Sequence, residues 1–371
     1  MSAVALGVAD RRVAARAVLP AYATAKVLTL VAVALAVVRH DGALTSTSLS
    51  QAFSHWDAVS HLDIAGHGYP SQLDYHDAFP PGYPLLIRAA SVVTRDLVLA
   101  GVLVSALAEL AALVFIHELV RHERDAGVAR FAVWAVALAP LGFFLTGVYT
   151  ESCFIAAAAL ALLLMRAGHM RGAALAGAVA VAMRVTGMVL LPVLAYELAR
   201  QGRIRRDGVW LALVPLPLLL FAAYLRLRTG DALAFLHAET LPSFGEAAAW
   251  PWDGLNTTLA TAAGSTDPTN RAIFVREIIA GVFGFVAVLA SWLDTRLARS
   301  LAVYATLVWL SAVSLTFWRS VPRYDLALFA VVIVVADLTA RIRAVRPVLV
   351  EASAAVLAWG AYVFAEGGWV G

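Results

Sequence analysis

Titratable side chains are concentrated in one short stretch of the sequence. Within 23 residues lie four histidines and four aspartates, the densest such group in the chain. A carboxylate in such a stretch can act as a general base that removes the proton of an attacking hydroxyl. We take Asp57 as the candidate base, and its neighbours Trp56, His55 and Asp63 as candidate substrate-binding residues. The histidines are His55, His61, His67 and His76, and the aspartates are Asp57, Asp63, Asp74 and Asp77.

A metal site is one alternative interpretation of this stretch. The spacing of its histidines and aspartates matches no zinc motif of the HExxH kind. We therefore predict that the protein needs no metal and no cofactor, with an essential divalent cation as the alternative. A polar surface loop without chemistry is the other alternative.

The apolar residues of the same stretch indicate how it is positioned. Their spacing between residues 59 and 65 predicts a short amphipathic helix lying on the membrane surface, which Gly66 and Gly68 would end. Three prolines follow, and a second interfacial helix is predicted over residues 85–95. The candidate base would then lie at a membrane surface.

The composition places most of the chain in a membrane. Of 371 residues, 61% are hydrophobic and 14% are charged, whereas a soluble globular domain has about 45–50% apolar and about 25% charged residues. The net charge of +3 is too small and too dispersed to indicate a nucleic-acid partner, and the single cysteine, Cys153, excludes an intrachain disulfide. We expect an all-α polytopic membrane protein forming a single domain over residues 1–371.

A spanning helix needs about 20 mostly apolar residues, and the sequence offers about ten membrane-embedded segments. One of them, 172–199, is interrupted by Met183-Arg184-Val185-Thr186-Gly187. The uninterrupted candidates lie near 19–38, 97–120, 127–147, 148–166, 208–227, 273–293, 300–318, 325–340 and 347–366.

The arginines predict the orientation of these segments, because cytoplasmic loops collect basic residues. With the N-terminus in the cytoplasm, the short basic loops before residue 172 lie on the cytoplasmic side. If 172–199 crossed the membrane once, the arginine-rich loops after it would lie on the non-cytoplasmic side. We therefore predict that 172–199 is a broken hairpin that turns near Arg184 and returns to the cytoplasm. Non-helical backbone at membrane depth is tolerated when it is buried in protein. The inner arginines include Arg121, Arg124, Arg130, Arg166, Arg171, Arg200, Arg203, Arg296, Arg299, Arg341, Arg343 and Arg346.

This topology leaves two long segments on the non-cytoplasmic side, 39–96 and 229–272. The first contains the aspartates and histidines described above. The second contains a Trp-Pro-Trp sequence that can anchor at the lipid headgroups or stack on a sugar. We list its polar and aromatic residues as His237, Glu239, Trp250, Trp252 and Asp253.

Two polar residues lie at the edges or breaks of predicted spans. Glu151 follows Tyr149 at the outer start of a span. There it can bind sugar hydroxyls, or it can simply be a carboxylate that the helix dipole stabilises. Arg184 lies in the break of the hairpin, where a buried guanidinium must find an anion. That anion is either a substrate phosphate or a carboxylate such as Glu151, Glu109 or Asp337.

Arg319 and Arg323 flank a proline on a short outer loop. Guanidinium groups bind phosphate through paired N–H donors and keep their charge at any working pH. We predict that Arg323, Arg319 and Arg184 bind a substrate phosphate. The alternative is an arginine that extends from the membrane edge to water.

Ordered motifs along the chain resemble those of PIG-V type mannosyltransferases. Each motif is weak alone, but the ordered set covers nearly the whole chain. They are Trp56-Asp57, Ile64-Ala65-Gly66-His67-Gly68-Tyr69, Ala78-Phe79-Pro80-Pro81-Gly82-Tyr83-Pro84-Leu85, Tyr149-Thr150-Glu151-Ser152, Met183-Arg184-Val185-Thr186-Gly187 and Ser320-Val321-Pro322-Arg323-Tyr324.

The resemblance implies a GT-C type glycosyltransferase fold and an inverting enzyme. Such an enzyme moves mannose from a polyprenyl-phosphate donor to a lipid or glycan acceptor on the non-cytoplasmic face, here of a bacterial plasma membrane. The family's catalytic aspartate maps onto Asp57, and we assign Glu151, Tyr149 and Tyr324 to substrate binding. The implied partners are the lipid-linked sugar donor, the acceptor and membrane lipids, with no nucleic acid. A transporter or flippase and a non-catalytic scaffold are the alternatives.

Overall fold

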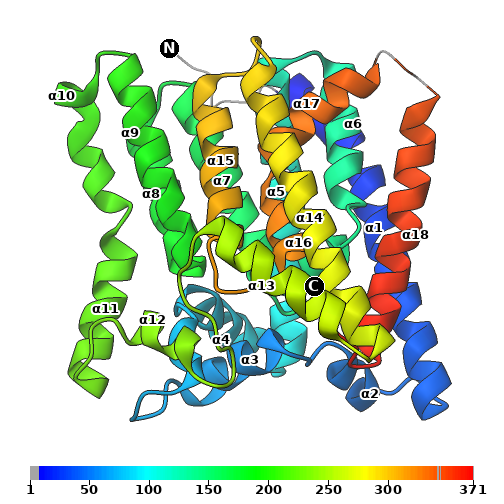
Figure 1. The fold of residues 1–371 in the computed structure, drawn as a ribbon. Helices are drawn as coiled ribbons and strands as arrows, with labels where there is room; N and C mark the ends of the chain where they lie inside the picture. Colours follow the sequence, from blue (N-terminus) through cyan, green and yellow to red (C-terminus); the bar gives the residue numbers. More distant parts are fainter. Residues whose placement is uncertain (1–7, 341, 343, 371) are drawn as a thin grey trace.

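The computed structural model describes residues 8–340, 342 and 344–370, with no side chains described for residues 8–13. Arg341 and Arg343, which the topology assigns to the cytoplasmic side, lie outside this range. The described chain is an all-helical bundle, with a layer of short helices at one end (Figure 1). Within these residues the β-pairing is limited to an isolated bridge between Ala248 and Leu315. The predicted all-α polytopic fold is confirmed.

Five helices or helical runs are long and apolar enough to cross a membrane, and each coincides with a predicted span. Three consecutive helices make up one of the five runs, Ile204–Thr229. The helices are α1 (Val8–Asp41), α5 (Leu97–Glu123), α10 (Ile204–Asp207), η4 (Gly208–Leu213), α11 (Leu216–Thr229), α14 (Pro268–Leu293) and α18 (Val345–Ala365).

Five helices that coincide with the remaining predicted membrane segments have 12 to 16 residues, so that each is about 18–24 Å long, less than the roughly 30 Å of a bilayer core. Four predicted spans therefore extend beyond the helices observed there, because their ends form turns inside the protein: 127–147, 148–166, 300–318 and 325–340. The shorter helices are α6 (Ala126–Ala137), α7 (Glu151–Arg166), α8 (Met170–Met183), α15 (Arg299–Val313) and α17 (Phe329–Ala340).

Short turns connect these helices inside the bundle. η2 (Gly142–Leu145) precedes α7, η3 (Val185–Val189) follows α8, and α16 (Val321–Tyr324) with η6 (Asp325–Ala327) joins α15 to α17. The motifs around Glu151, Arg184 and Arg323 therefore all lie where helices end within the protein.

The predicted broken hairpin is present. After η3 the chain returns as α9 (Leu190–Arg200). Glu197 near the end of α9 lies 3.6 Å from Arg166 at the end of α7, and Arg203 donates a hydrogen bond to the carbonyl of Gly168. Residues on either side of 172–199 therefore lie at the same end of the bundle.

The opposite end is covered by the two long connecting segments. Both predicted interfacial helices of 39–96 are present, as α3 and α4 (Figure 1). α3 buries the apolar Ile64 and Ala65 together with the polar Ser60 and His61, and it leaves Val59 exposed. The helices of this layer are α2 (Ser46–Ala52), α3 (Asp57–His67), η1 (Tyr75–Ala78), α4 (Gly82–Thr94), α12 (Ala234–His237), η5 (Ala238–Thr240) and α13 (Pro251–Gly264).

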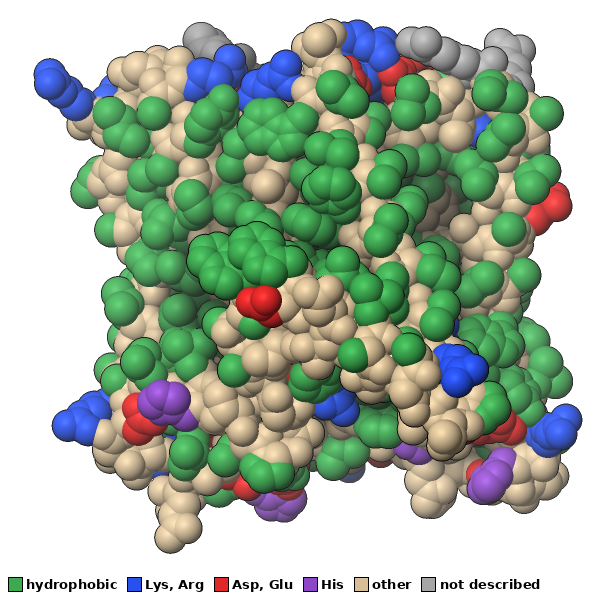
Figure 2. Space-filling view, in the orientation of Figure 1, with side chains coloured by type: hydrophobic (Ala, Val, Ile, Leu, Met, Phe, Trp, Pro, Cys, Tyr) green, Lys and Arg blue, Asp and Glu red, His purple; other side chains and the backbone are tan. Residues whose placement is uncertain are grey.

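The surface has the polarity of a membrane protein. On the face shown in Figure 2, hydrophobic side chains cover the region between the two ends, and charged and histidine side chains gather mainly at those ends. One charge pair lies inside the bundle: Lys26, the single lysine, contacts Glu109 and donates a hydrogen bond to Thr146 at 2.6 Å. This pair joins α1 to α5.

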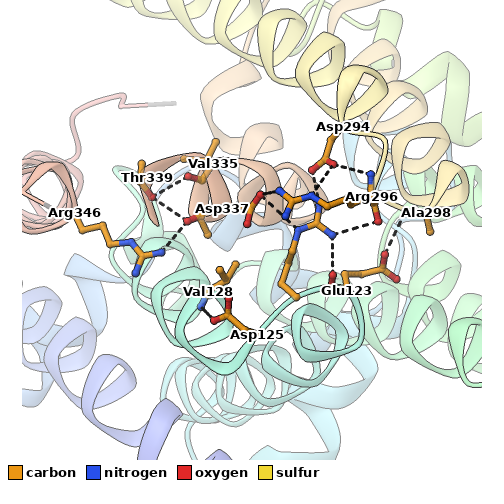
Figure 3. Close-up of polar contacts among 12 residues, drawn as sticks. Glu123, Asp125, Val128, Asp294, Arg296, Ala298, Val335, Asp337, Thr339 and Arg346 are labelled. Carbon is orange, nitrogen blue, oxygen red and sulfur yellow. Dashed lines mark hydrogen bonds and ion pairs between the residues drawn. The ribbon is translucent and has the colours of Figure 1, made fainter. Parts of the chain in front are cut away.

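A second charged network joins helix ends at the arginine-rich end of the bundle (Figure 3). Arg124, which follows α5, pairs with Asp294, which follows α14. Arg296 pairs with Asp337 of α17. Glu109 and Asp337 thus pair with Lys26 and Arg296, whereas the carboxylate partner of Arg184 is Glu151.

Two motif glycines allow close backbone approach. A Cβ on Gly82 would lie 2.4 Å from the carbonyl oxygen of Ala182, so that glycine is required for α4 to contact the end of α8. A Cβ on Gly187 would lie 2.5 Å from the backbone nitrogen of Val181. Neither obstacle is a flexible side chain, so the backbone itself would have to move.

We predict that Gly187→Ala destabilises the protein by about 1–3 kcal/mol, the usual effect of overpacking. Thermal unfolding in detergent micelles measures the effect. Gly264→Ala is the matched control, since a Cβ there meets no atom within 4 Å. Equal unfolding temperatures for the two variants would show that the turn after α8 is loosely packed.

Candidate active site

Asp57 begins α3 directly after a residue with unusual backbone geometry. Trp56 has φ 55° and ψ −126°, a conformation that side-chain-bearing residues rarely adopt. Such conformations persist where the surrounding structure fixes them, which is common at functional sites. Here Tyr149 contributes, because its hydroxyl donates a hydrogen bond to the carbonyl of His55 at 3.0 Å.

Four charged side chains from separate parts of the chain meet at Asp57. Arg323 Nη1 lies 2.7 Å from Asp57 Oδ2, and Arg323 Nε lies 3.1 Å from Glu151 Oε1. Arg184 Nη1 lies 2.5 Å from the same oxygen of Glu151. The cluster thus joins α3, α7, the break after α8 and α16. Its members come from four of the six motifs.

Arg323 retains unused hydrogen-bonding capacity within this cluster. It is only 6% exposed, yet its Nε and Nη1 lack an aligned hydrogen-bond partner among the described residues. Its guanidinium also lies 5.4 Å from the ring centre of Tyr149. Similarly, the guanidinium of Arg184 lies 4.7 Å from the ring centre of Tyr324. The aromatic rings add to the stabilisation of the two cations.

Three members of the cluster, Asp57, Arg184 and Arg323, line a cavity of about 360 Å³, within the usual range for small-molecule sites. Arg319 also lines it, and the structure gives Arg319 no carboxylate partner within ion-pair distance among the described residues. Its guanidinium donates a hydrogen bond to the carbonyl of Phe244 and lies over the ring of Trp369. The cavity therefore has one unpaired guanidinium in addition to those of the cluster.

The electrostatic environment keeps Asp57 ionised. Burial is the largest single effect and opposes its negative charge, but the charge and hydrogen bond of Arg323, together with the other nearby groups including Arg184, outweigh burial and hold the pKa of Asp57 below its ordinary value. His61, one helical turn later, has its pKa lowered by burial to about 4 and is therefore neutral at pH 7. The side chain of Asp57 remains about 20% exposed, so a substrate can reach it.

The predicted site residues divide into two groups. Seven line the cavity or belong to the charged cluster beside it: Trp56, Asp57, Glu151, Arg184, Arg319, Arg323 and Tyr324.

Tyr149 and His55 lie behind this group, with their contact fixing the start of α3. Asp63 is not brought to the cavity. It points to the other side of α3, where it lies 2.7 Å from His67 and 3.1 Å from His76. The i, i+6 spacing from Asp57 explains this, since such residues lie on different faces of a helix.

Sequence reasoning missed several residues of the site. His61 could have been found, because it lies four residues after Asp57 and shares its helix face. Glu239 and Glu246 line the cavity from a loop of the second outer segment, and Trp369 lines it from the end of the chain. No local pattern marks these three.

Glu277 of α14 was also missed, and it positions Arg323. Its carboxylate accepts hydrogen bonds from the backbone N–H groups of Ser320 at 3.0 Å and Val321 at 2.8 Å. Ser320 has φ 63°, in the left-handed region. This buried carboxylate therefore holds a strained turn immediately before Arg323.

The described residues offer no group of three or more histidine, cysteine, aspartate or glutamate side chains placed to hold a metal ion. The chemistry available at the cavity is that of a carboxylate base beside guanidinium groups.

Comparisons with known proteins agree with the motifs. A model of the mannosyltransferase (PIG-V) family matches residues 16–202. A comparison with curated proteins finds no match.

Among solved structures, the chain is similar to the oligosaccharyltransferase of Archaeoglobus fulgidus. Against its complex with zinc and sulfate the TM-score is 0.44 at 14% identity, over 93% of this chain and 53% of that chain. Against the same protein tethered with an acceptor peptide, the TM-score is 0.45 at 13% identity, over 94% of this chain and 56% of that chain. The chain thus spans little more than half the length of the oligosaccharyltransferase, and this likeness concerns the fold alone.

The family model matches just over half of the chain, and the matched range includes Asp57, Glu151 and Arg184. With its apolar helices and this match, the chain is a membrane-embedded member of the PIG-V family of mannosyltransferases.

Proposed function

We propose that the protein transfers a mannosyl residue from a polyprenyl-phosphate donor to a hydroxyl of a lipid or glycan acceptor. The observation that carries this proposal is the contact of Asp57 with Arg323 beside a cavity. A base for the acceptor and a cation for the leaving phosphate lie side by side there. The reaction needs both groups within the length of one sugar.

The proposed reaction is a single displacement. The acceptor oxygen attacks the anomeric carbon as Asp57 takes its proton, and the bond from that carbon to the phosphate oxygen breaks. The polyprenyl phosphate leaves with the bonding electron pair. Attack from the face opposite the phosphate inverts the configuration, so that a β-linked donor gives an α-linked product.

Arg323 has two roles in this proposal. Without substrate it neutralises Asp57 and Glu151. The donor phosphate competes with these carboxylates for the guanidinium of Arg323, so that Arg323 turns toward the phosphate and Asp57 becomes available as a base. Stabilising the negative charge that develops on the leaving phosphate lowers the barrier. Arg319 and Arg184 contribute further positive charge, and Trp56 and Tyr324 contact the sugar from the cavity wall.

The proposed topology follows from the distribution of arginine. The cavity is lined in part by residues of α3, and α3 lies at the end of the bundle that carries the two long segments (Figure 1). By the positive-inside rule, the N-terminus is cytoplasmic and the cavity opens on the non-cytoplasmic side of the plasma membrane. Donor and acceptor lipids then reach the cavity sideways from the bilayer.

We predict that Asp57→Asn lowers the transfer rate by at least about 100-fold, because an amide cannot accept the acceptor proton. The assay combines purified protein, synthetic polyprenyl-phosphate mannose and a membrane-lipid extract, with mass spectrometry of the mannosylated product. Donor binding should persist, since Asn keeps the shape of the site. Near-normal turnover would remove Asp57 from the mechanism.

We predict that Arg319→Gln weakens donor binding by about 10-fold or more without changing the unfolding temperature. A hydrogen bond to a charged group contributes about 1.5–3 kcal/mol, and Arg319 has no carboxylate partner to leave unpaired.

Arg323→Gln is the informative comparison. It should lower both donor affinity and the unfolding temperature, because it leaves buried carboxylates without their cation. If both variants bind donor as the wild type does, the arginines do not hold the phosphate.

A further inference from the structure

η5 and the loop that follows it place two carboxylates in the cavity wall that the proposed mechanism does not use. Glu239 and Glu246 both line the cavity that contains Asp57 and Arg323. The loop is fixed to the segment before Arg319. Thr316 N–H donates to the carbonyl of Ala247 at 2.9 Å, and Ala249 N–H donates to the carbonyl of Ser314 at 3.0 Å. The two carboxylates are thus held in place over the site.

These carboxylates have no evident structural task. The backbone N–H of Glu246 donates to the carbonyl of Glu239 at 2.8 Å. Among the described residues, however, neither side chain accepts a hydrogen bond or forms an ion pair. A carboxylate that serves the fold would be expected to have such partners. Both carboxylates are instead available to a ligand that enters the cavity.

Their charge state suits a ligand that both donates and accepts hydrogen bonds. Burial, with the nearby charges of Glu246 and Asp57, raises the pKa of Glu239 to about 8. Burial also raises the pKa of Glu246 to about 7, although Arg319 and Arg323 oppose the shift. Near neutral pH the pair therefore offers both a carboxyl O–H and carboxylate oxygens.

The same cavity contains a second unpartnered polar group. His61 lines it and is only 2% exposed, yet its Nδ1 has no hydrogen-bond partner among the described residues. A cavity with unused carboxyl and imidazole groups, next to guanidinium groups, matches a ligand rich in hydroxyls joined to a phosphate. A sugar phosphate has that composition.

The position of the pair relative to the reacting groups identifies which sugar it contacts. Both glutamates line the same cavity as Asp57 and as the three arginines Arg184, Arg319 and Arg323. The pair therefore shares one small cavity with the base and with the proposed phosphate-binding arginines. The group that must lie between base and phosphate is the transferred sugar.

We propose that Glu239 and Glu246 form a subsite that binds hydroxyls of the transferred hexose. This inference rests on the proposed function, because it uses the donor phosphate to place the sugar. A divalent cation held by the two carboxylates is the competing interpretation, and the described residues offer no third ligand of the usual kind beside them.

Equilibrium binding to two probes tests this subsite. One probe is a short-chain polyprenyl-phosphate mannose, and the other is the same polyprenyl phosphate without sugar. The protein is the full chain in detergent micelles, as wild type, Glu239→Gln, Glu246→Gln and Arg319→Gln. Glu351→Gln, on an exposed face of α18, is the matched control.

At pH 9, above the pKa of about 8 of Glu239 and of about 7 of Glu246, both side chains are ionised. We then expect each cavity glutamate variant to bind the mannosyl probe about 10-fold more weakly or worse, the effect of losing a hydrogen bond to a charged group. Both should bind the sugar-free probe as the wild type does. Arg319→Gln should lose affinity for both probes, and Glu351→Gln for neither.

Three results would overturn the subsite. Equal loss of both probes in the glutamate variants, with a lower unfolding temperature, would show a structural role. Unchanged affinity for the mannosyl probe would show no role. If the wild type loses the mannosyl probe in EDTA and binds it again when Mg²⁺ or Mn²⁺ is added, the carboxylates bind a cation. Wild-type protein that binds neither probe would instead refute the proposed function, and the subsite with it.

Discussion

The structure depends on one buried guanidinium, that of Arg323, which lies between the carboxylates of Asp57 and Glu151. An uncompensated charge inside a membrane protein is costly, so each member of this group requires the others. The ion pairs fix the relative positions of the outer-layer helix α3, the start of α7 and the turn after α15. Arg184 extends the same arrangement to the broken hairpin. The charged residues that hold these elements together thus include the residues that line the cavity.

Several helices of the bundle are short, and this brings the charged group together. Because α7, α8, α15 and α17 are too short to cross a bilayer alone, their ends meet inside the protein, where turns can present polar side chains. Close backbone contacts, such as that of Gly187 with the end of α8, keep these turns compact. Glu277 completes the arrangement by holding the backbone before Arg323.

Much of this arrangement could be predicted from the sequence, since apolar runs, arginine-rich loops and ordered motifs are local signals. The hairpin at Arg184 could be predicted from the positions of the arginines along the chain, and Asp57 could be predicted from its motif. The partner of each charge could not be predicted. Arg323 and Asp57 are separated by more than two hundred residues, and only the folded chain brings them into contact. Glu239, Glu246 and Glu277 were missed because nothing in their neighbouring residues distinguishes them from ordinary polar residues.

The central claim is that donor phosphate takes Arg323 from Asp57 and so releases the base. A structure of the full chain bound to a non-transferable phosphonate analogue of polyprenyl-phosphate mannose tests it most directly. The account predicts phosphonate oxygens within hydrogen-bonding distance of Arg323 and Arg319, with Asp57 no longer paired and facing the anomeric carbon. A phosphonate bound away from these arginines, with the pair between Arg323 and Asp57 intact, would contradict it.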